Sequence, residues 1–205
     1  IVRIDGETYY CIHCYDQMPP FFMSIVSSAD HWLFISSTGG LTAGRVNAES
    51  ALFPYYTDDK VAENWVNTGP VTCLFVRRDA ATDGSADAIR WEPFSADQSE
   101  TQRIVRNLYK NVSGDKLIFE EVNLDLGLTF RYAWRTSDRF GFVRTSWLQN
   151  NLEQPCTVQV LDGVRNLLPY GATTTLQTNM SNLLDAYKRG ELDPATGLGI
   201  FALSA

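Results

Sequence analysis

The segment from Gly39 to Lys60 carries the densest set of side chains able to recognise a small polar ligand. It begins Gly-Gly-Leu-Thr-Ala-Gly-Arg and ends Phe-Pro-Tyr-Tyr-Thr-Asp-Asp-Lys. Aromatic rings stack on the apolar faces of sugars, while Arg, Asn and Asp bind hydroxyl groups. The segment has little periodicity, so we interpret it as a loop held in one shape for a purpose. The side chains expected to bind carbohydrate are Arg45, Asn47, Tyr55, Tyr56, Asp58 and Asp59.

Arg45 has a more specific role in this hypothesis. A guanidinium group can hold a phosphate or a carboxylate through two parallel hydrogen bonds. Tyr55 and Tyr56 would supply the stacking rings, together with Trp65 further along the chain. Two other tryptophans, Trp134 and Trp147, fall on strand faces where burial in the core is expected.

Two pairs of adjacent carboxylates, Asp58-Asp59 and Glu120-Glu121, are compatible with glycoside cleavage only if each works with a distant partner. That reaction uses two carboxyl groups on opposite sides of the scissile bond. Neighbours on a strand point to opposite faces, so neither pair forms this arrangement alone. Asp58 with Glu120 or Asp125 is the open alternative. We favour a glutamate pair that straddles a strand and assign no catalytic residue.

The motif Cys11-Ile12-His13-Cys14 has the spacing of zinc ligands and of redox dithiols. A zinc site needs two more ligands, and Cys73 and Cys156 lie singly in apolar runs. A redox motif begins the helix of a βαβ unit, and no such alternation is present. We therefore expect reduced, buried thiols, no metal and no cofactor. Reduced thiols slightly favour a cytoplasmic location.

Acyl-transfer chemistry has little support in this sequence. A Ser-His-Asp triad would have to use His13 or His31, the only two histidines. Neither lies near a nucleophile elbow, and the Gly-x-Ser-x-Gly motif does not occur.

Composition and charge limit the class of protein. The chain has 205 residues, of which 44% are hydrophobic, 12% aromatic and 20% charged, as expected for one globular domain. Its net charge of −7 argues against a nucleic-acid partner, because phosphate backbones require a basic surface. No run of about eighteen apolar residues is present, so we expect no membrane span.

Short strands separated by turn residues dominate the predicted secondary structure. The second half predicts four successive antiparallel strands, and one of them places Leu128, Phe130, Tyr132 and Trp134 on a single face. Asp79–Asp87 is predicted to be a hairpin tip, and Gln102–Val112 fits either a strand or a helix. The four successive strands are Lys116–Asn123, Gly127–Thr136, Phe140–Gln149 and Cys156–Val164, and the other predicted strands are Glu7–Cys14, Phe21–Ser28, His31–Ser36, Val71–Arg78 and Ala88–Phe94.

One helix is predicted, at Met180–Arg189, with Gly190 as its terminator. Many strands with one terminal helix indicate a mainly β fold, a two-sheet antiparallel sandwich followed by a C-terminal linker helix. We expect a β-sandwich domain over residues 1–178. Residues 179–205 would be a helical linker, the truncated start of a following domain.

The order of features resembles the N-terminal region of the cellobiose/chitobiose phosphorylase family and related glycoside hydrolases. The resemblance lies in Trp32–Ser36, Gly39-Gly40, Gly44-Arg45 and the segment from Leu52 to Asp59. It continues from Phe119 to Gly163, through Gly127-Leu128-Thr129, Val143-Arg144-Thr145 and Val160-Leu161-Asp162-Gly163. The resemblance implies a galactose-mutarotase-like super-sandwich, joined by a helical linker to an (α/α)₆ barrel.

In this family the catalytic acid lies in the barrel, and phosphate or water attacks the anomeric carbon. The resemblance therefore implies a non-catalytic domain of a glycoside phosphorylase or hydrolase, inactive alone. Its partners would be a carbohydrate, the catalytic domain of the same chain and, in a homodimer, a second copy.

Two alternatives of different classes stay open. The first is an autonomous carbohydrate-binding module, which predicts sugar affinity in this chain alone. The second is a purely structural or oligomerisation domain, which the apolar run Gly199–Ala205 favours.

Overall fold

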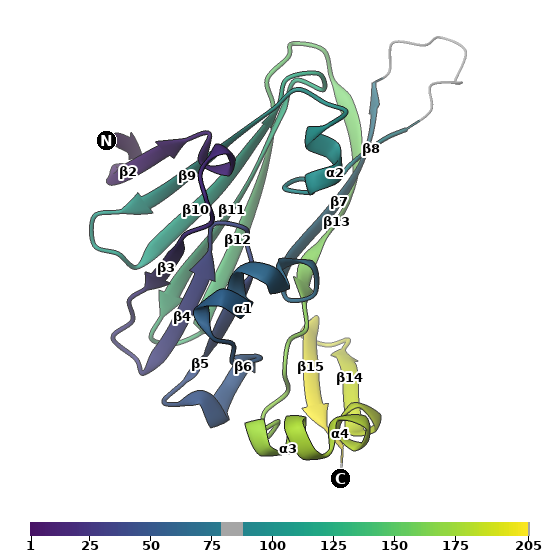
Figure 1. The fold of residues 1–205 in the computed structure, drawn as a ribbon. Helices are drawn as coiled ribbons and strands as arrows, with labels where there is room; N and C mark the ends of the chain where they lie inside the picture. Colours follow the sequence, from purple (N-terminus) through teal and green to yellow (C-terminus); the bar gives the residue numbers. More distant parts are fainter. Residues whose placement is uncertain (79–87, 205) are drawn as a thin grey trace. The chain divides into compact units, whose positions relative to one another are not determined.

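The structure, a computed structural model, describes residues 1–78 and 88–204, without the side chains of Asp58, Asp59 and Ser99 (Figure 1). The predicted hairpin tip Asp79–Asp87 lies outside this range. The fold is mainly β, as the sequence predicts, and its strands form antiparallel sheets. The sheets have six, four, three and two strands.

The chain divides into two compact units, which are described separately. The first contains residues 1–20, 25–29 and 70–164, and the second contains residues 21–24, 30–69 and 165–205. The second unit therefore crosses the predicted domain boundary at residue 178, because residues 179–205 belong with residues 30–69.

The first unit is built on a six-stranded antiparallel sheet in the order β1-β2-β9-β10-β11-β12 (Figure 1). Its strands are β1 (Val2–Ile4), β2 (Glu7–His13), β9 (Ile104–Asn111), β10 (Lys116–Asn123), β11 (Leu128–Ser137) and β12 (Gly141–Asn150). The segment that fitted a strand or a helix is therefore the strand β9. The predicted face of β11 is confirmed, because Leu128, Phe130, Tyr132 and Trp134 are all buried.

A second sheet of three strands completes the core of this unit. It has the order β13-β7-β8, with β7 (Gly69–Arg78), β8 (Ile89–Trp91) and β13 (Cys156–Arg165). Trp91 on β8 is fully buried and donates from Nε1 to Glu121 Oε1 on β10, at 2.8 Å. Phe94 makes edge contacts with Phe119 and Tyr132 of the large sheet. The two sheets thus pack as a sandwich. The short helix α2 (Ala96–Ser99) follows β8 and precedes β9 in the chain.

One predicted pairing in this unit is wrong. The first three of the four predicted successive strands, β10, β11 and β12, do pair as neighbours. The fourth, β13, lies instead beside β7 in the other sheet. A local hydrophobic pattern shows that a strand forms but not which distant strand it joins, and here the partner lies about 90 residues earlier, as in the hydrogen bond from Thr72 to Asp162.

The second unit contains a four-stranded sheet, two short helices that follow one another and a terminal hairpin. The sheet order is β3-β4-β5-β6, with β3 (Phe22–Ile25), β4 (His31–Ser36), β5 (Leu41–Arg45) and β6 (Ala51–Phe53). Ala51, Leu168, Ala172 and Leu184 form a buried cluster. The remaining elements are α1 (Asp58–Glu63), α3 (Thr174–Asn179), α4 (Ser181–Tyr187), β14 (Lys188–Asp193) and β15 (Leu198–Leu203).

The interpretation of Gly39–Lys60 as a loop is wrong. The segment contains β5, β6 and the start of α1. Its periodicity was hidden because Leu41, Thr42, Ala43 and Gly44 are all buried, so β5 is covered on both faces and shows no alternation of apolar and polar residues.

The predicted terminal helix is partly correct. Helix α4 covers Ser181–Tyr187, but Lys188 begins β14, and Gly190 lies within that strand instead of ending a helix. The apolar run near the end of the chain is β15, paired antiparallel with β14.

Candidate functional site

Four of the six candidate side chains in the segment 39–60 are described, and one of those, Asn47, has a local structural role. Arg45 is the last residue of β5, is exposed, and lies opposite His31. Asn47 accepts a hydrogen bond on Oδ1 from the Glu49 backbone nitrogen at 3.1 Å, and so caps the 3₁₀ turn Ala48–Ser50.

The two tyrosines differ in exposure. Tyr55 is 53% exposed and packs edge-on against Trp32, with 6.0 Å between ring centroids. Tyr56 is half-buried, as is Trp65. Asp58 and Asp59 are the first residues of α1, and their side chains lie outside the described part. Among the described candidates Arg45, Asn47, Tyr55 and Tyr56, no two are joined by a hydrogen bond or a ring contact. Their role in binding a carbohydrate therefore stays a prediction.

A groove lies instead on the large sheet of the first unit. Strands β1 and β12 are the two edges of this sheet, which would be about 24 Å apart if the sheet were flat. Yet Asp5, next to β1, and Trp147 on β12 line the same cavity of about 680 Å³. The sheet therefore curls, and its concave face forms the groove.

The concave face carries one row of polar side chains that runs across five strands. Cross-strand pairing places His13 opposite Asn107, Asn107 opposite Glu120, and Glu120 opposite Arg131. Arg131 lies opposite Trp147 in turn. Directly paired residues share a face, so the row is a consequence of the register.

Glu120 is the centre of this row and is almost fully buried, with 3% of its surface exposed. Its Oε1 accepts hydrogen bonds from Asn107 Nδ2 at 2.7 Å and from Tyr109 OH at 2.8 Å. Its Oε2 accepts from Arg131. Burial by itself raises the pKa of Glu120, but these three donors outweigh it and leave the pKa below its ordinary value. These contacts therefore favour the ionised form of Glu120, and both of its oxygens already accept hydrogen bonds.

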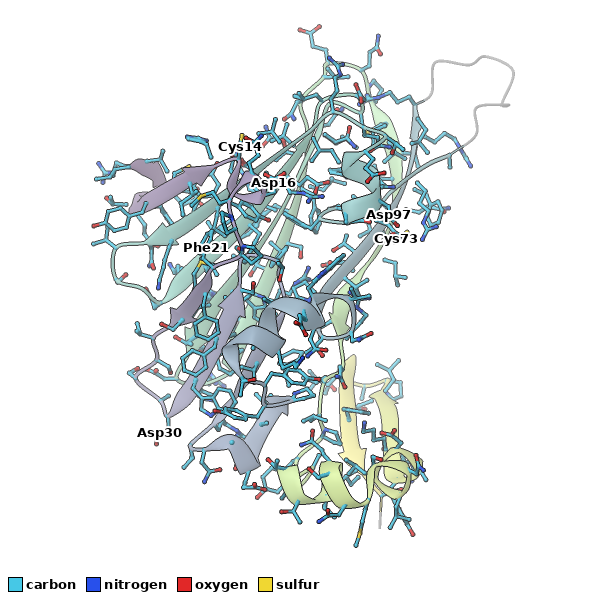
Figure 2. The ribbon with its side chains drawn as sticks, viewed as in Figure 1. Cys14, Asp16, Phe21, Asp30, Cys73 and Asp97 are labelled. Atoms are coloured by element: carbon cyan, nitrogen blue, oxygen red, sulfur yellow. The ribbon has the colours of Figure 1, made fainter. Side chains whose placement is uncertain are left out.

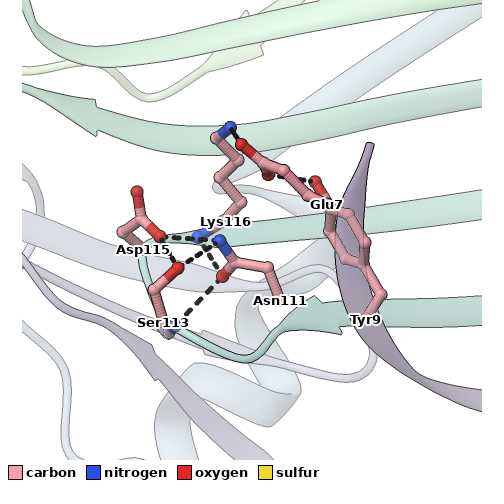
Figure 3. Close-up of polar contacts among 7 residues, drawn as sticks. Glu7, Tyr9, Asn111, Ser113, Asp115 and Lys116 are labelled. Carbon is pink, nitrogen blue, oxygen red and sulfur yellow. Dashed lines mark hydrogen bonds and ion pairs between the residues drawn. The ribbon is translucent and has the colours of Figure 1, made fainter. Parts of the chain in front are cut away.

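A second polar cluster lies at the other end of the groove, where β2 and β10 begin (Figure 3). Glu7 accepts hydrogen bonds from Lys116 and, at 3.1 Å, from the Tyr9 hydroxyl. The bond from Lys116 lowers the pKa of Glu7, and burial raises that of Tyr9 to about 12. Beside them Asn111 donates to Asp115 Oδ1 at 2.7 Å and shapes the turn between β9 and β10.

The expectation that Glu120 and Glu121 straddle a strand is confirmed. Glu121 points into the core, where it is fully buried and accepts from Trp91, the Phe94 backbone and Arg106. Burial raises the pKa of Glu121, the opposite of Glu120. The two carboxyl groups therefore point to opposite faces of the sheet and cannot act on one glycosidic bond.

The C-x-x-C segment places a thiol and an imidazole beside the Asn107 amide, on the same face of the sheet as the groove. Cys11 Sγ lies 3.5 Å from His13 Nε2, and His13 Nδ1 lies 3.2 Å from Asn107 Oδ1. This order resembles that of a nucleophile, a base and an orienting amide. However, Sγ is also 3.8 Å from His13 Nδ1, so it lies beside the ring and not in line with one nitrogen. Burial also raises the pKa of the Cys11 thiol, which disfavours the reactive thiolate.

All four cysteines are free and half-buried. Cys14 follows β2 and Cys73 lies on β7, well apart in Figure 2. In the part of the chain that the structure describes, no three His, Cys, Asp or Glu side chains gather as metal ligands.

The sequence assigned Trp147 to the core, and this is wrong, since 45% of its surface is exposed. The other tryptophan assigned there, Trp134, is buried as expected. The alternation of β11 indicated that Arg131 and Arg135 face away from the core. It could not show that this face is concave, because curvature depends on all six strands together.

Comparison with known proteins does not add a family assignment. A scan against protein-family models gave no match, and a search of curated proteins found no similar protein. Within residues 1–78 and 88–204, no helix has the length and apolar character needed to cross a bilayer.

Proposed function

We propose that this chain is a carbohydrate-binding, non-catalytic domain of a carbohydrate-active enzyme, and that the concave groove of its large sheet holds the sugar. The observation that carries the proposal is the exposed ring of Trp147 directly opposite Arg131 on a curled sheet face.

The chemistry of the groove suits a polyol. Trp147 offers an apolar ring face, and the floor of the groove includes the apolar residues Ala133 and Ile118. Arg131, Gln149 and Asp5 surround this surface with donors and acceptors for hydroxyl groups. An apolar surface with a few convergent polar groups is the usual composition of a small-molecule site.

The same geometry supports binding without catalysis. Cleavage of a glycoside needs an acid with a raised pKa close to a second carboxylate. The carboxylates at the groove whose pKa is shifted, Glu7 and Glu120, are shifted downward and already hydrogen-bonded. The carboxyl group whose pKa is raised, Glu121, is in the core.

The wider role rests on the family resemblance. We place the chain in a glycoside phosphorylase or hydrolase related to the cellobiose/chitobiose phosphorylases, where it shapes the sugar site, the dimer interface or both. The catalytic acid would belong to a helical domain of the same parent chain.

The test is isothermal titration of this chain with glucose, cellobiose, N,N′-diacetylchitobiose and inorganic phosphate. We expect a sugar of the panel to bind in the millimolar range or tighter. Trp147→Ala should weaken that binding at least tenfold, equivalent to about 1.4 kcal/mol. Tyr55→Ala, which alters an equally exposed ring in the segment 39–60, is the matched control and should leave the affinity unchanged.

Two outcomes contradict the proposal. If no sugar of the panel binds, the domain is not a self-sufficient sugar-binding site. If Tyr55→Ala abolishes binding while Trp147→Ala does not, the sugar site lies in the segment 39–60 and not in the groove.

A structural or oligomerisation role is the second candidate, and one observation favours it. The hairpin of β14 and β15 exposes Leu192, Leu198, Ile200 and Phe201, on both of its faces. A two-stranded hairpin is marginally stable alone, and exposed apolar strands pair readily with other chains. Sedimentation of the wild type and of Ile200→Lys tests this role, which requires a dimer that the charged residue dissociates.

A further inference from the structure

The spacing of residues along β11 gives the length of the groove. Arg131, Ala133 and Arg135 are alternate residues of β11, so all three lie on the concave face. Arg135 is four positions after Arg131, which corresponds to about 13 Å along the strand. Trp147 lies opposite Arg131 at one end, and Lys116 lies opposite Arg135 at the other.

The residues between these two ends are uncharged. Ala133 pairs with Ile118 on β10 and with Thr145 on β12, and all three line the cavity. Ala133 and Ile118 belong to a buried cluster with Tyr9 and Tyr109. The charged groups are therefore gathered at the two ends of the groove.

The charges of the groove balance. Its three cationic side chains, Lys116, Arg131 and Arg135, are matched by Asp5, Glu7 and the Glu120 carboxylate that binds Arg131. Lys116 is paired with Glu7. Among the residues that the structure describes, Arg135 and Asp5 have no ion-pair partner, so one donor group and one acceptor group are available to a ligand.

We infer that the groove binds a linear, neutral oligosaccharide of at least two rings, with its chain along β11. One ring stacks on Trp147, and a second ring lies at the other end, where Arg135 and Asp5 bind its hydroxyl groups. This inference rests on the proposed function, and it specifies the length and the charge of the ligand.

The first measurement is a chain-length series by titration. Glucose, cellobiose and cellotriose form one series, and N-acetylglucosamine with its dimer and trimer forms the other. We expect the disaccharide of the series that binds to have at least tenfold higher affinity than its monosaccharide, because it reaches both ends. Equal affinities for monosaccharide and disaccharide would overturn the two-ended groove while leaving sugar binding intact.

Two substitutions test the two ends of the groove separately. Arg135→Ala should reduce disaccharide affinity to the level of the monosaccharide and leave monosaccharide affinity unchanged. Trp147→Ala should weaken both. Arg139→Ala removes an exposed arginine in the turn after β11, where its guanidinium lies over the Phe140 ring, and is the matched control expected to change neither.

Salt dependence tests the charge of the ligand. A neutral oligosaccharide should bind equally well at low and high ionic strength, whereas binding of an anion weakens as salt is added. We therefore expect digalacturonate, an acidic disaccharide, to bind at least tenfold more weakly than the neutral one. Tighter, salt-sensitive binding of digalacturonate would overturn the neutral assignment. Absence of binding by every sugar would instead contradict the proposed function itself.

Discussion

At the scale of single residues, Glu120 and Glu121 show how one strand can hold two buried carboxyl groups whose pKa values are shifted in opposite directions. Glu120 faces the groove and receives three hydrogen bonds that keep it ionised. Glu121 faces the core, where loss of water dominates despite the ion pair with Arg106 at 2.8 Å. The difference follows from which face of β10 each side chain takes.

Replacing Glu120 by Gln should reduce the free energy of unfolding by about 1–3 kcal/mol at pH 7, because Arg131 loses its charged acceptor. The folded-state pKa of Glu120 is lowered, so its stabilisation is present above the unfolded pKa of about 4.3. It is lost as the pH falls through the folded value. Urea unfolding from pH 7 to pH 3 should therefore show the gap between wild type and variant closing on acidification.

Glu121→Gln is the matched control and should behave in the opposite sense. The folded-state pKa of Glu121 is raised, so the wild type gains stability from this group as the pH falls from neutral toward about 4.3. Its advantage over Glu121→Gln should widen over that range. Parallel pH profiles for the two variants would contradict the opposite pKa shifts of Glu120 and Glu121.

At the scale of elements, β5 illustrates a strand whose sequence is dictated by its neighbours. The Trp32 ring on β4 lies across Gly44 of β5 toward Ala51 of β6. A Cβ atom at Gly44 would lie 2.5 Å from Trp32 Cζ2 and 2.9 Å from the Ala51 Cα. Glycine is needed here for close approach of an indole ring, not for an unusual backbone angle.

Gly44→Ala should therefore destabilise the protein by about 1–3 kcal/mol, the usual cost of overpacking. Gly190→Ala in β14, where a new Cβ meets nothing within 4 Å, should change stability by about 0.5 kcal/mol or less. Thermal unfolding of the two variants measures the contrast. Equal melting temperatures would show that the indole ring moves away at no cost.

The two sheets of the first unit are joined by an ion pair. Arg144 on β12 binds Asp162 on β13 through both terminal nitrogens, at 2.7 and 2.8 Å. Thr72 and Ser146 also donate to this carboxylate. Burial raises the pKa of Asp162, but the hydrogen bonds from Arg144, Thr72 and Ser146 outweigh it and lower the pKa overall.

Asp162→Asn should cost about 3–5 kcal/mol, because it leaves the largely buried Arg144 guanidinium without a counter-charge. Asp185→Asn removes an exposed partner of Lys188 and should cost about 0–1 kcal/mol. Chemical denaturation followed by circular dichroism measures both changes. Similar losses for the two variants would mean that the pair between β12 and β13 is screened by solvent.

At the scale of the whole molecule, the second unit is assembled from segments far apart in the chain. Leu184 of α4 is 7% exposed and belongs to one cluster with Ala51 of β6 and Leu168. Residues after 178 are thus part of a core that also contains residues before 60. Their removal should affect stability directly.

A chain ending at residue 178 should lose at least the stability that Leu184→Ala loses, about 2–5 kcal/mol for a buried leucine. Leu192→Ala in the same terminal segment is the control, since Leu192 is 69% exposed and should cost about 0.5 kcal/mol or less. Urea unfolding compares the three. A truncated chain as stable as the wild type would support a domain boundary at residue 178.

Some elements of this molecule could be predicted from the sequence and others could not, and the reasons are physical. Strand β4, with its alternating Leu33 and Ile35, has the predicted bounds, because only one of its faces is fully buried and the period of two is visible. Strand β5 was missed because both of its faces are covered. Helix α4 was predicted, but Lys188 and Gly190, which were assigned to its end, join a strand because β15 offers them a partner.

The sequence by itself determined the mainly β class, the core face of β11, the opposed directions of Glu120 and Glu121, and the acidic surface charge. Each of these follows from local sterics, the two-residue period of a strand or simple composition. Tertiary structure alone decided that His13, Asn107, Glu120, Arg131 and Trp147 form one row, and that the sheet curls so that Arg131 and Trp147 line a groove. Register and curvature depend on pairing between strands that are distant in the chain, and no local pattern encodes those distances.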